Sequence, residues 1–367
     1  MTLDPRPSTH DDGRSTAHDL RPALRTIADG ETLTEFQAEA AMEAMLTGAA
    51  SEVEIAGLLL GLRSRGETLD ELAGFTRAMR RHAVAVEPGH DDAIDLCGTG
   101  GDSMGTFNIS TAAAFVAAGA GVPVAKHGNK AVSSKAGSAD VLDALGVNTS
   151  LRKEGVEACL REAGIAFLFA PYFHPALKHV MPVRRALGVR TFFNILGPLC
   201  NPAGVKRQLV GAFSEDTAQM MARILLRLGS EHVVVVYAHD GLDELSTTSP
   251  TTIYQTGSDA YDGGMLHQIV EPERFGLARV KASDLTGGTK EENAEIVRAI
   301  LRDEAGPKRD IVLLNSAYAL LASGRFDGLE ACLAAASDSI ASGRALAKLD
   351  ALVEVSNDVS ESGRVGV

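Results

Sequence analysis

The sequence predicts an α/β protein with a large domain, built on a mainly parallel central sheet flanked by helices, and a small all-α domain. Short apolar runs alternate with helical patterns from about residue 93 onward, which is typical of βαβ units around a parallel sheet. Three helical patterns with short turns come before that region, which favours a small bundle. A helical pair at about 171–198 interrupts the alternation.

Three capping boxes mark the N-terminal helices. They begin at Thr34, Ser51 and Thr68, each with Gln or Glu three residues later and an apolar helical pattern behind it. Residues 1–22 are polar, with prolines and charges and no apolar core of a secretory signal, so we expect a disordered tail there. The small helical domain is therefore expected to span residues 23–88.

The large domain is expected to comprise residues 89–170 and 199–367. Its expected strands are 93–97, 122–128, 165–170, 208–214 and 232–238, with two shorter candidates at 251–256 and 265–270. Its expected helices are 110–121, 138–146, 289–305, 309–323 and an alanine-rich segment from about 328.

The composition and net charge limit the binding partners and the cellular compartment that we expect for this protein. The chain has 367 residues, of which 48 are acidic and 35 basic, a formal net charge of −13. This charge opposes nucleic-acid binding, which normally needs a basic face, but it does not exclude a small anionic substrate. No stretch approaches the roughly 18 apolar residues of a membrane span. The four cysteines are widely spaced, so we expect reduced thiols and a cytoplasmic protein.

A glycine-rich loop, GTGGDSMGT at 98–106, joins the first expected strand to the next helix. Bare backbone N–H groups before a helix N-terminus can bind phosphate, and Asn108, Ser110 and Thr111 add donors there. The loop lacks the Gly-Lys-Ser/Thr of a P-loop and the third glycine of the dinucleotide fingerprint. The alternative is a tight strand-to-helix turn with an N-cap.

Two further loops follow expected strands. Residues 126–140 carry Lys126, Lys130 and Lys135 among glycines and serines, which favours a polyphosphate, although a solvated surface is the alternative. Asp243 and Glu244 follow the strongest strand. Adjacent carboxylates are hard oxygen ligands of the kind Mg²⁺ prefers, although an isolated pair can also be a solvated acidic turn.

Taken together, these loops resemble the anthranilate phosphoribosyltransferase family. The resemblance is carried by GTGGD (98–102), NIST (108–111), KHGNKAVSSKAGSAD (126–140), RRALGVRTFFNILGPLCNP (184–202), DGLDELS (240–246) and GGTKEENA (287–294). It implies transfer of the 5-phosphoribosyl group from 5-phosphoribosyl 1-pyrophosphate to the amino group of anthranilate, in tryptophan biosynthesis. It also implies Mg²⁺, a homodimer formed through the N-terminal helices, and a small domain that includes the inserted segment 171–198.

The same resemblance implies the site residues. The phosphoribosyl-pyrophosphate site would consist of Gly98, Gly101, Asp102, Thr106, Asn108, Ile109, Ser110, Thr111, Lys126, His127, Gly128, Asn129, Lys130, Ala131, Val132, Ser133, Ser134 and Ser138. Anthranilate would meet Gly98, Asn129 and Arg184, and Mg²⁺ would bind Ser110, Asp243 and Glu244. Lys130 stands where the family usually has arginine.

Several alternatives stay open at this point. Arg185 and Arg190 resemble Arg184 chemically, and only the resemblance selects Arg184. His127 is a candidate proton acceptor, although it can equally shape its loop. The rival functions are a pyrimidine nucleoside phosphorylase and a non-catalytic relative of the same fold that binds nucleic acid.

Overall fold

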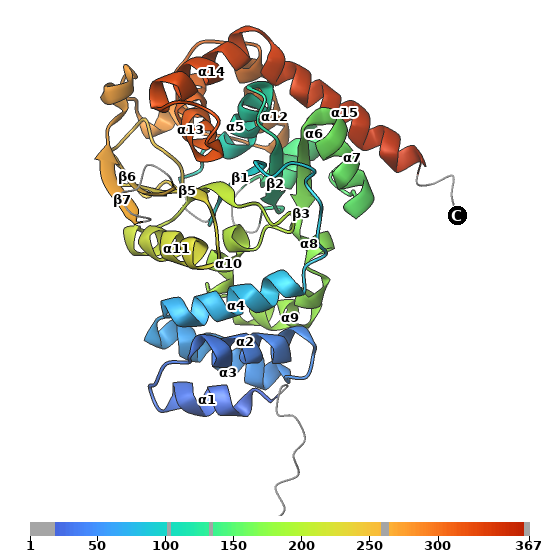
Figure 1. Cartoon of the computed structure of the whole chain (residues 1–367), viewed down its shortest axis with the longest axis vertical. Helices are drawn as coiled ribbons and strands as arrows, with labels where there is room; N and C mark the ends of the chain where they lie inside the picture. Colours follow the sequence, from blue (N-terminus) through green and yellow to red (C-terminus); the bar gives the residue numbers. More distant parts are fainter. Residues whose placement is uncertain (1–18, 101–103, 132–134, 258–263, 363–367) are drawn as a thin grey trace, which may run out of the picture.

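The computed structural model describes residues 19–100, 104–131, 135–257 and 264–362 (Figure 1). Within these ranges a seven-stranded sheet has the order β3-β2-β1-β4-β5-β6-β7. Strands β1 to β5 are parallel, and β6 and β7 are antiparallel additions at one edge. The expected mainly parallel sheet is confirmed. The strands are β1 (Ile94–Gly98), β2 (Val124–Gly128), β3 (Ile165–Phe169), β4 (Arg207–Gly211), β5 (His232–Ala238), β6 (Thr251–Thr256) and β7 (Met265–Val270).

The strand order reverses between β1 and β4. The chain runs outward from β1 through β2 to β3, then returns across the inserted segment to place β4 on the other side of β1. In open α/β sheets the ligand crevice lies beyond the carboxyl ends of the strands at such a reversal. Gly98 and Gly211 are paired at those two carboxyl ends, so the fold itself singles out this position.

Helices cover both faces of the sheet. One buried cluster packs helices against one face: α5 (Ile109–Gly119), α6 (Ser138–Ala144), α7 (Lys153–Ala163), α12 (Lys290–Leu301), α13 (Pro307–Ser323), α14 (Leu329–Ala341) and α15 (Arg344–Ser362). The other face packs on α10 (Phe193–Leu199) and α11 (Glu215–Arg227). Figure 1 shows the sheet between these two layers, with the N-terminal helices below α10 and α11.

The N-terminal helices form a bundle. They are α1 (Arg21–Ala28), α2 (Glu35–Leu46), α3 (Glu52–Arg65) and α4 (Leu69–Arg81). All three expected capping boxes are present, at Thr34, Ser51 and Thr68. The helix α1 begins at Arg21, so residues 21 and 22, which we expected in the disordered tail, are helical. Pro22 suits the first turn because it has no N–H to leave unpaired.

The inserted segment packs on this bundle. It contains α8 (Ala170–Phe173), the 3₁₀ turn η1 (Pro175–His179), α9 (Met181–Leu187) and α10. The turn η1 contacts α2, α9 contacts α3, and α10 contacts α4. The apolar side chains of Val183, Phe192 and Leu196 share one buried cluster with those of the bundle. Segments far apart in sequence therefore build one helical layer.

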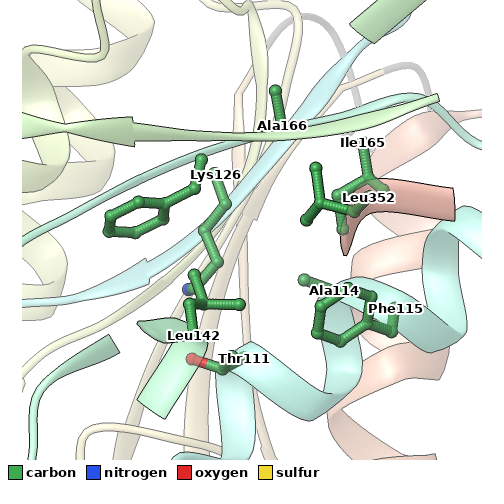
Figure 2. A pocket seen from close by; sticks show the side chains of 9 residues that line it. Thr111, Ala114, Phe115, Lys126, Leu142, Ile165, Ala166 and Leu352 are labelled. Carbon is green, nitrogen blue, oxygen red and sulfur yellow. The ribbon is translucent and has the colours of Figure 1, made fainter. Parts of the chain in front are cut away.

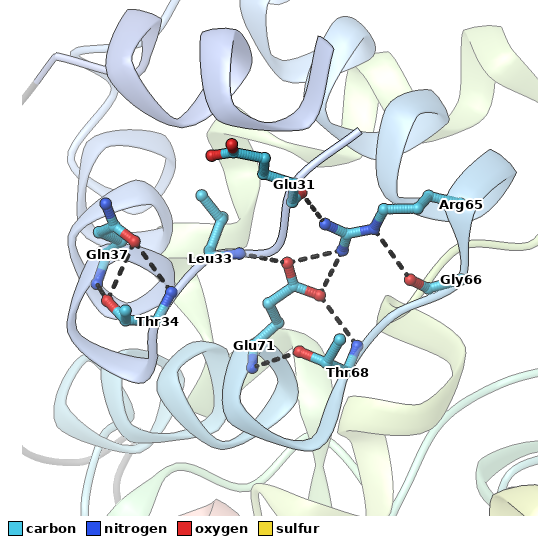
Figure 3. A network of polar contacts seen from close by, with 8 residues as sticks. All are labelled: Glu31, Leu33, Thr34, Gln37, Arg65, Gly66, Thr68 and Glu71. Atoms are coloured by element: carbon cyan, nitrogen blue, oxygen red, sulfur yellow. Dashed lines mark hydrogen bonds and ion pairs between the residues drawn. The ribbon is translucent and has the colours of Figure 1, made fainter. Parts of the chain in front are cut away.

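A buried carboxylate fixes the turns of the bundle (Figure 3). Glu71 is fully buried and accepts hydrogen bonds from the backbone N–H of Leu33 at 2.8 Å and of Thr68 at 2.9 Å. Its third partner is the guanidinium of Arg65, at 2.5 Å. A buried charge is tolerable only when it is paired and hydrogen-bonded in this way. Glu71 thus ties the α1–α2 connection to the start of α4.

Some elements differ from the sequence expectations. The alanine-rich segment from 328 forms two helices, α14 and α15, because the chain turns at Gly343, whose φ is +76°. The helices α7 and α11 had no counterpart among our expectations. None of the helices described here is long and apolar enough to cross a membrane.

Candidate active site

The Asp243 loop lies directly on the ends of β1 and β4. The backbone N–H of Gly100 donates to an Asp243 carboxylate oxygen at 2.7 Å. A Cβ on Gly98 would come within 2.5 Å of the same carboxylate, and one on Gly211 would collide with the Asp243 carbonyl. The Asp243 loop occupies the space where side chains at Gly98 and Gly211 would lie, so both strands end in glycine.

Glu244 meets the start of α5. Its carboxylate accepts a hydrogen bond from the backbone N–H of Ser110 at 3.1 Å. Burial, followed by the neighbouring negative charge of Asp243, raises the pKa of Glu244 from 4.5 to about 8. Ser110 is more than 130 residues away from Asp243 and Glu244 in sequence. The fold thus brings Ser110 next to Glu244 and its neighbour Asp243, and their role as magnesium ligands stays a prediction.

Lys126 is buried inside the protein next to Ser110, instead of being exposed to solvent. Its side chain is almost fully buried, and its Nζ donates to the Leu96 carbonyl at 2.5 Å and to Ser110 Oγ at 3.3 Å. Its charge opposes the rise in the pKa of Glu244. Lys126 therefore contributes a fixed positive charge from inside the protein and holds the Ser110 side chain.

The glycine loop is held by a segment near residue 286. The backbone N–H of Gly287 donates to the Gly105 carbonyl at 2.9 Å, and Thr106 forms a β-bridge with Thr286. Asn293 is buried and donates through Nδ2 to Asn108 Oδ1 at 3.0 Å. This explains in physical terms why the GGTKEENA stretch accompanies the glycine loop.

Asn108 also connects the first loop to the second. Its Nδ2 donates to the Ala136 carbonyl at 3.3 Å, so its side chain is held from both sides. Ile109 and Thr111 are buried, and the backbone N–H of Ile109 donates to the Phe107 carbonyl at 2.9 Å. Asn108 therefore contributes to the relative placement of the two loops.

The second loop is tied back on itself. Asp140 accepts from the backbone N–H of Ala131 at 3.0 Å and of Gly137 at 2.9 Å, and Ser138 Oγ donates to the Asn129 carbonyl at 3.3 Å. Lys130 is exposed and lies 3.7 Å from the Asp143 carboxylate. Asn129 is exposed, and its Oδ1 accepts a hydrogen bond from the backbone N–H of Lys130 at 2.8 Å.

Two buried histidines lie behind the second loop. The His127 and His174 rings are 5.2 Å apart, and the Nε2 atom of each is buried without a hydrogen-bond partner among the residues that the structure describes. Burial lowers the pKa of His127 to about 3 and that of His174 to about 4. Both rings are therefore neutral at pH 7, and His127 is a weak base there.

Arg184 differs from its two neighbours in sequence. Its guanidinium stacks on the Phe193 ring at 4.8 Å and contacts Met181 Sδ at 3.6 Å, and burial lowers its pKa. Within the described ranges Arg184 forms no ion pair with a carboxylate, and its side-chain hydrogen bond goes to Met181. Arg185 and Arg190 are exposed. A partly buried guanidinium without a counter-ion is the more suitable of the three to bind an anionic ligand.

Five expected site residues lie outside the described part of the chain. They are Gly101, Asp102, Val132, Ser133 and Ser134. Both loops are therefore described only at their ends, where they join the sheet and the helices.

A small cavity lies between β2, β3 and the helices α5, α6 and α15, and Thr111 and Lys126 are among the residues that line it (Figure 2). Its lining is almost entirely apolar, and its volume is about 10 Å³, room for about one water molecule. It is too small for a sugar diphosphate or an aromatic acid, so we do not assign a substrate to it.

Comparison with known proteins agrees with this geometry. Residues 90–346 match the glycosyl transferase family a/b domain, and residues 21–83 match the helical bundle domain of the same family. An anthranilate phosphoribosyltransferase of Salinibacter ruber is 60% identical over 92% of this chain and 99% of its own length. The chain belongs to the anthranilate phosphoribosyltransferase family.

Solved members of the family share the fold. The anthranilate phosphoribosyltransferase of Thermus thermophilus has a TM-score of 0.85 and 42% identity, over 91% of this chain and 99% of that one. The Saccharomyces cerevisiae enzyme, solved in complex with PRPP and Mg, has a TM-score of 0.83 and 27% identity, over 94% and 100% of the two chains. The helical bundle and the α/β architecture are therefore those of the anthranilate phosphoribosyltransferases.

The residues of this family member fit a magnesium ion. The side chains of Ser110, Asp243 and Glu244 offer hard oxygen atoms. Burial, followed by the negative charge of Asp243, raises the pKa of Glu244, and a divalent cation would favour its ionised form. No group of three or more His, Cys, Asp or Glu suited to a metal occurs in the described ranges. The remaining ligands would therefore come from substrate phosphate and water, as is usual for Mg²⁺.

Sequence reasoning missed one buried residue next to this site. Asn315 on α13 is fully buried and hydrogen-bonds the backbone of Leu245, the residue after Glu244. The available signal was a single asparagine within an apolar helical run, because a buried amide requires a partner.

Proposed function

We propose that the protein transfers the 5-phosphoribosyl group of 5-phosphoribosyl 1-pyrophosphate to the amino group of anthranilate, which releases pyrophosphate and serves tryptophan biosynthesis. The observation that carries this proposal is the Asp243–Glu244 loop seated on Gly98 and Gly211 at the strand reversal. Membership of the family indicates the reaction. The position of the Asp243–Glu244 loop supports the same reaction from the residues of this chain.

The diphosphate would lie against the glycine loop. The glycine loop and the start of α5 would lie beside the diphosphate, and Ser110, Asp243 and Glu244 would hold Mg²⁺ next to it. In this structure the N–H groups of Gly100 and Ser110 donate to the carboxylates of Asp243 and Glu244. The bound cation would neutralise the charge that develops on the departing pyrophosphate. Lys126 adds a buried positive charge below the same position.

Anthranilate would bind through its carboxylate to Arg184. A guanidinium can bind a carboxylate with two parallel hydrogen bonds, which fixes orientation as well as position. The exposed amide of Asn129, on the second loop, and the small Gly98 would contact the same substrate. The two substrates would then be held in line for reaction, which is the largest contribution we assign to the protein.

The chemistry needs no base before attack. The amine of anthranilate is neutral at pH 7, and its lone pair forms the new bond to the anomeric carbon as the bond to pyrophosphate breaks. The surplus proton on nitrogen then leaves to water or to the substrate carboxylate. His127, with a pKa of about 3, is a poor acceptor, so we assign it to shaping the second loop.

We also propose a homodimer formed through the bundle. Phe36 on α2 is 80% exposed and Val53 on α3 is 82% exposed. Leu60 is two helical turns after Val53, so these two apolar side chains lie on the same face of α3. Exposed apolar groups of this kind mark interaction surfaces.

The division into a small domain (23–88 and 171–198) and a large domain (89–170 and 199–367) also belongs to the proposal. So does a cytoplasmic location, which the four free cysteines favour.

The test is a direct assay. Purified protein is mixed with anthranilate, 5-phosphoribosyl 1-pyrophosphate and Mg²⁺, and the fluorescence of anthranilate is followed. We expect a loss of fluorescence that requires the sugar diphosphate and stops on addition of a chelator. Phosphate-dependent cleavage of thymidine without turnover of anthranilate would contradict the proposal and favour a nucleoside phosphorylase.

A further inference from the structure

We propose that Asn315 on α13 is a positioning residue that fixes the backbone carrying Glu244. This inference rests on the proposed function, because it takes Glu244 as a magnesium ligand. Asn315 contacts neither the substrates nor the metal site itself. It would act through the main chain of the Asp243–Glu244 loop.

The contacts of Asn315 are directed at a single residue of that loop. Its Oδ1 accepts from the backbone N–H of Leu245 at 2.9 Å, and its Nδ2 donates to the backbone carbonyl of Leu245 at 2.9 Å. The second Nδ2 hydrogen goes to the Ile311 carbonyl at 2.9 Å, within α13. The carboxamide thus bonds both the backbone N–H and the backbone carbonyl of Leu245, as a neighbouring strand would.

The loop needs such a partner because it is buried away from a strand. Leu245 is fully buried, and a buried backbone N–H or carbonyl without a partner is costly. The strand β5 ends at Ala238, so no ladder hydrogen bond reaches this residue. Asn315 supplies both missing partners from an element 70 residues further along the chain.

The result is that Glu244 lies between two fixed points. On one side Asp243 rests on Gly98 and Gly211, where no side chain fits. On the other side Leu245 is held by Asn315. With its backbone held on both sides, Glu244 is placed where its carboxylate accepts the hydrogen bond from the Ser110 N–H.

The far end of the loop has its own, separate anchor. Asp240 accepts from the Ser246 hydroxyl at 3.0 Å and from the Thr248 hydroxyl, and its backbone N–H donates to Ser249 Oγ at 3.2 Å. These contacts close the turn after β5 and hold the Ser246 side chain, two residues after Glu244. Asn315 differs from this network because it bonds the backbone N–H and carbonyl of Leu245, the residue next to Glu244.

The chain offers a matched control at the next position. Ser316 is equally buried on α13, and its hydroxyl donates to the Val312 carbonyl at 2.7 Å, within the helix. Asn315→Leu removes the carboxamide with little change in size, and Ser316→Ala removes a polar contact that does not touch the loop. A purely structural role would affect both variants alike.

The first measurement is hydrogen exchange of the metal-free protein. We expect peptides that cover Leu245 to exchange faster in Asn315→Leu than in the wild type, with Ser316→Ala unchanged there. The second is a Mn²⁺ titration, followed by electron paramagnetic resonance, with 5-phosphoribosyl 1-pyrophosphate present. We expect Asn315→Leu to bind Mn²⁺ about ten-fold more weakly, the range typical for loss of an outer-shell partner.

The outcomes separate the inference from the function on which it rests. Wild-type Mn²⁺ affinity in Asn315→Leu, or an equal loss in Ser316→Ala, overturns the role of Asn315 and leaves the proposed function standing. Absence of Mn²⁺ binding in the wild type contradicts the metal site, and the inference with it. If Asn315→Leu does not fold, Asn315→Ser, which admits a water in place of the carboxamide, is measured in the same two ways.

Discussion

The carboxylate of Asp243 lies where a side chain on Gly98 would have to be, within 2.5 Å of the Cβ position. Two parts of the chain separated by 145 positions are thus fitted to each other at the strand reversal. The absence of a side chain on Gly98 is part of the proposed metal site, in addition to leaving room for substrate.

This relationship predicts the effect of Gly98→Ala. The new methyl group would displace Asp243, and a shift of about 1 Å at a reacting centre can cost about 100-fold in rate. We expect kcat/KM to fall by about that factor and the Mg²⁺ concentration for half-maximal rate to rise. Gly57→Ala is the control, since a Cβ there meets only the flexible end of Leu24. Equal kinetics for Gly98→Ala and the wild type would contradict the close approach.

Arg184→Ala should act mainly on one substrate. Loss of a hydrogen bond to a charged group costs about 1.5–3 kcal/mol, or roughly 10- to 150-fold. We expect the KM for anthranilate to rise by that factor, with little change in the KM for the sugar diphosphate. Arg185→Ala, which removes an exposed guanidinium on the same helix, should leave both constants unchanged. Steady-state kinetics that show the larger effect on the sugar diphosphate would reject the assignment.

The buried His174 should make the protein sensitive to acid. Its pKa is lowered from 6.5 to about 4, so the unfolded state takes up the proton first as the pH falls. The stability linked to His174 is therefore complete above pH 6.5 and is lost as the pH falls toward 4.

We expect His174→Gln to reduce the loss of unfolding free energy between pH 7 and 4.5 by on the order of 2 kcal/mol, measured by urea denaturation. His90→Gln, at an exposed position, is the control. The same pH dependence in His174→Gln and wild type would show that this ring does not carry the effect.

The proposed dimer surface gives a test by association state. Val53→Asp places a charge on the apolar face of α3 and should shift the protein from dimer to monomer in sedimentation velocity. Leu266→Asp, on the edge strand β7, makes the same chemical change at a side chain that is 41% exposed and should leave a dimer. A Val53→Asp protein that remains dimeric would exclude this face.

The sequence was sufficient to predict structural elements where the signal was local. The capping boxes at Thr34, Ser51 and Thr68 predicted three helix starts because each box is a short-range pattern of hydrogen bonds. The Asp243–Glu244 pair was proposed as a metal site because two adjacent carboxylates follow a strong strand, and that assignment stays a prediction. Tertiary contacts were not predictable in this way.

Three examples show the limit. Nothing local in the sequence places Asn293 against Asn108, or Asn315 against Leu245, because each contact joins elements from 70 to 185 residues apart. The helix α1 was missed because its apolar pattern is short and it begins next to polar residues. For the two side-chain contacts, the partner that decides the structure lies far away in the sequence.

The most direct test of the central claim is a crystal structure of the protein soaked with 5-phosphoribosyl 1-pyrophosphate and Mn²⁺, measured at a wavelength where manganese scatters anomalously. The account predicts an anomalous peak bounded by Ser110, Asp243 and Glu244, with the diphosphate against the glycine loop. A peak away from these side chains, or a diphosphate bound outside the β1–β4 reversal, would contradict it.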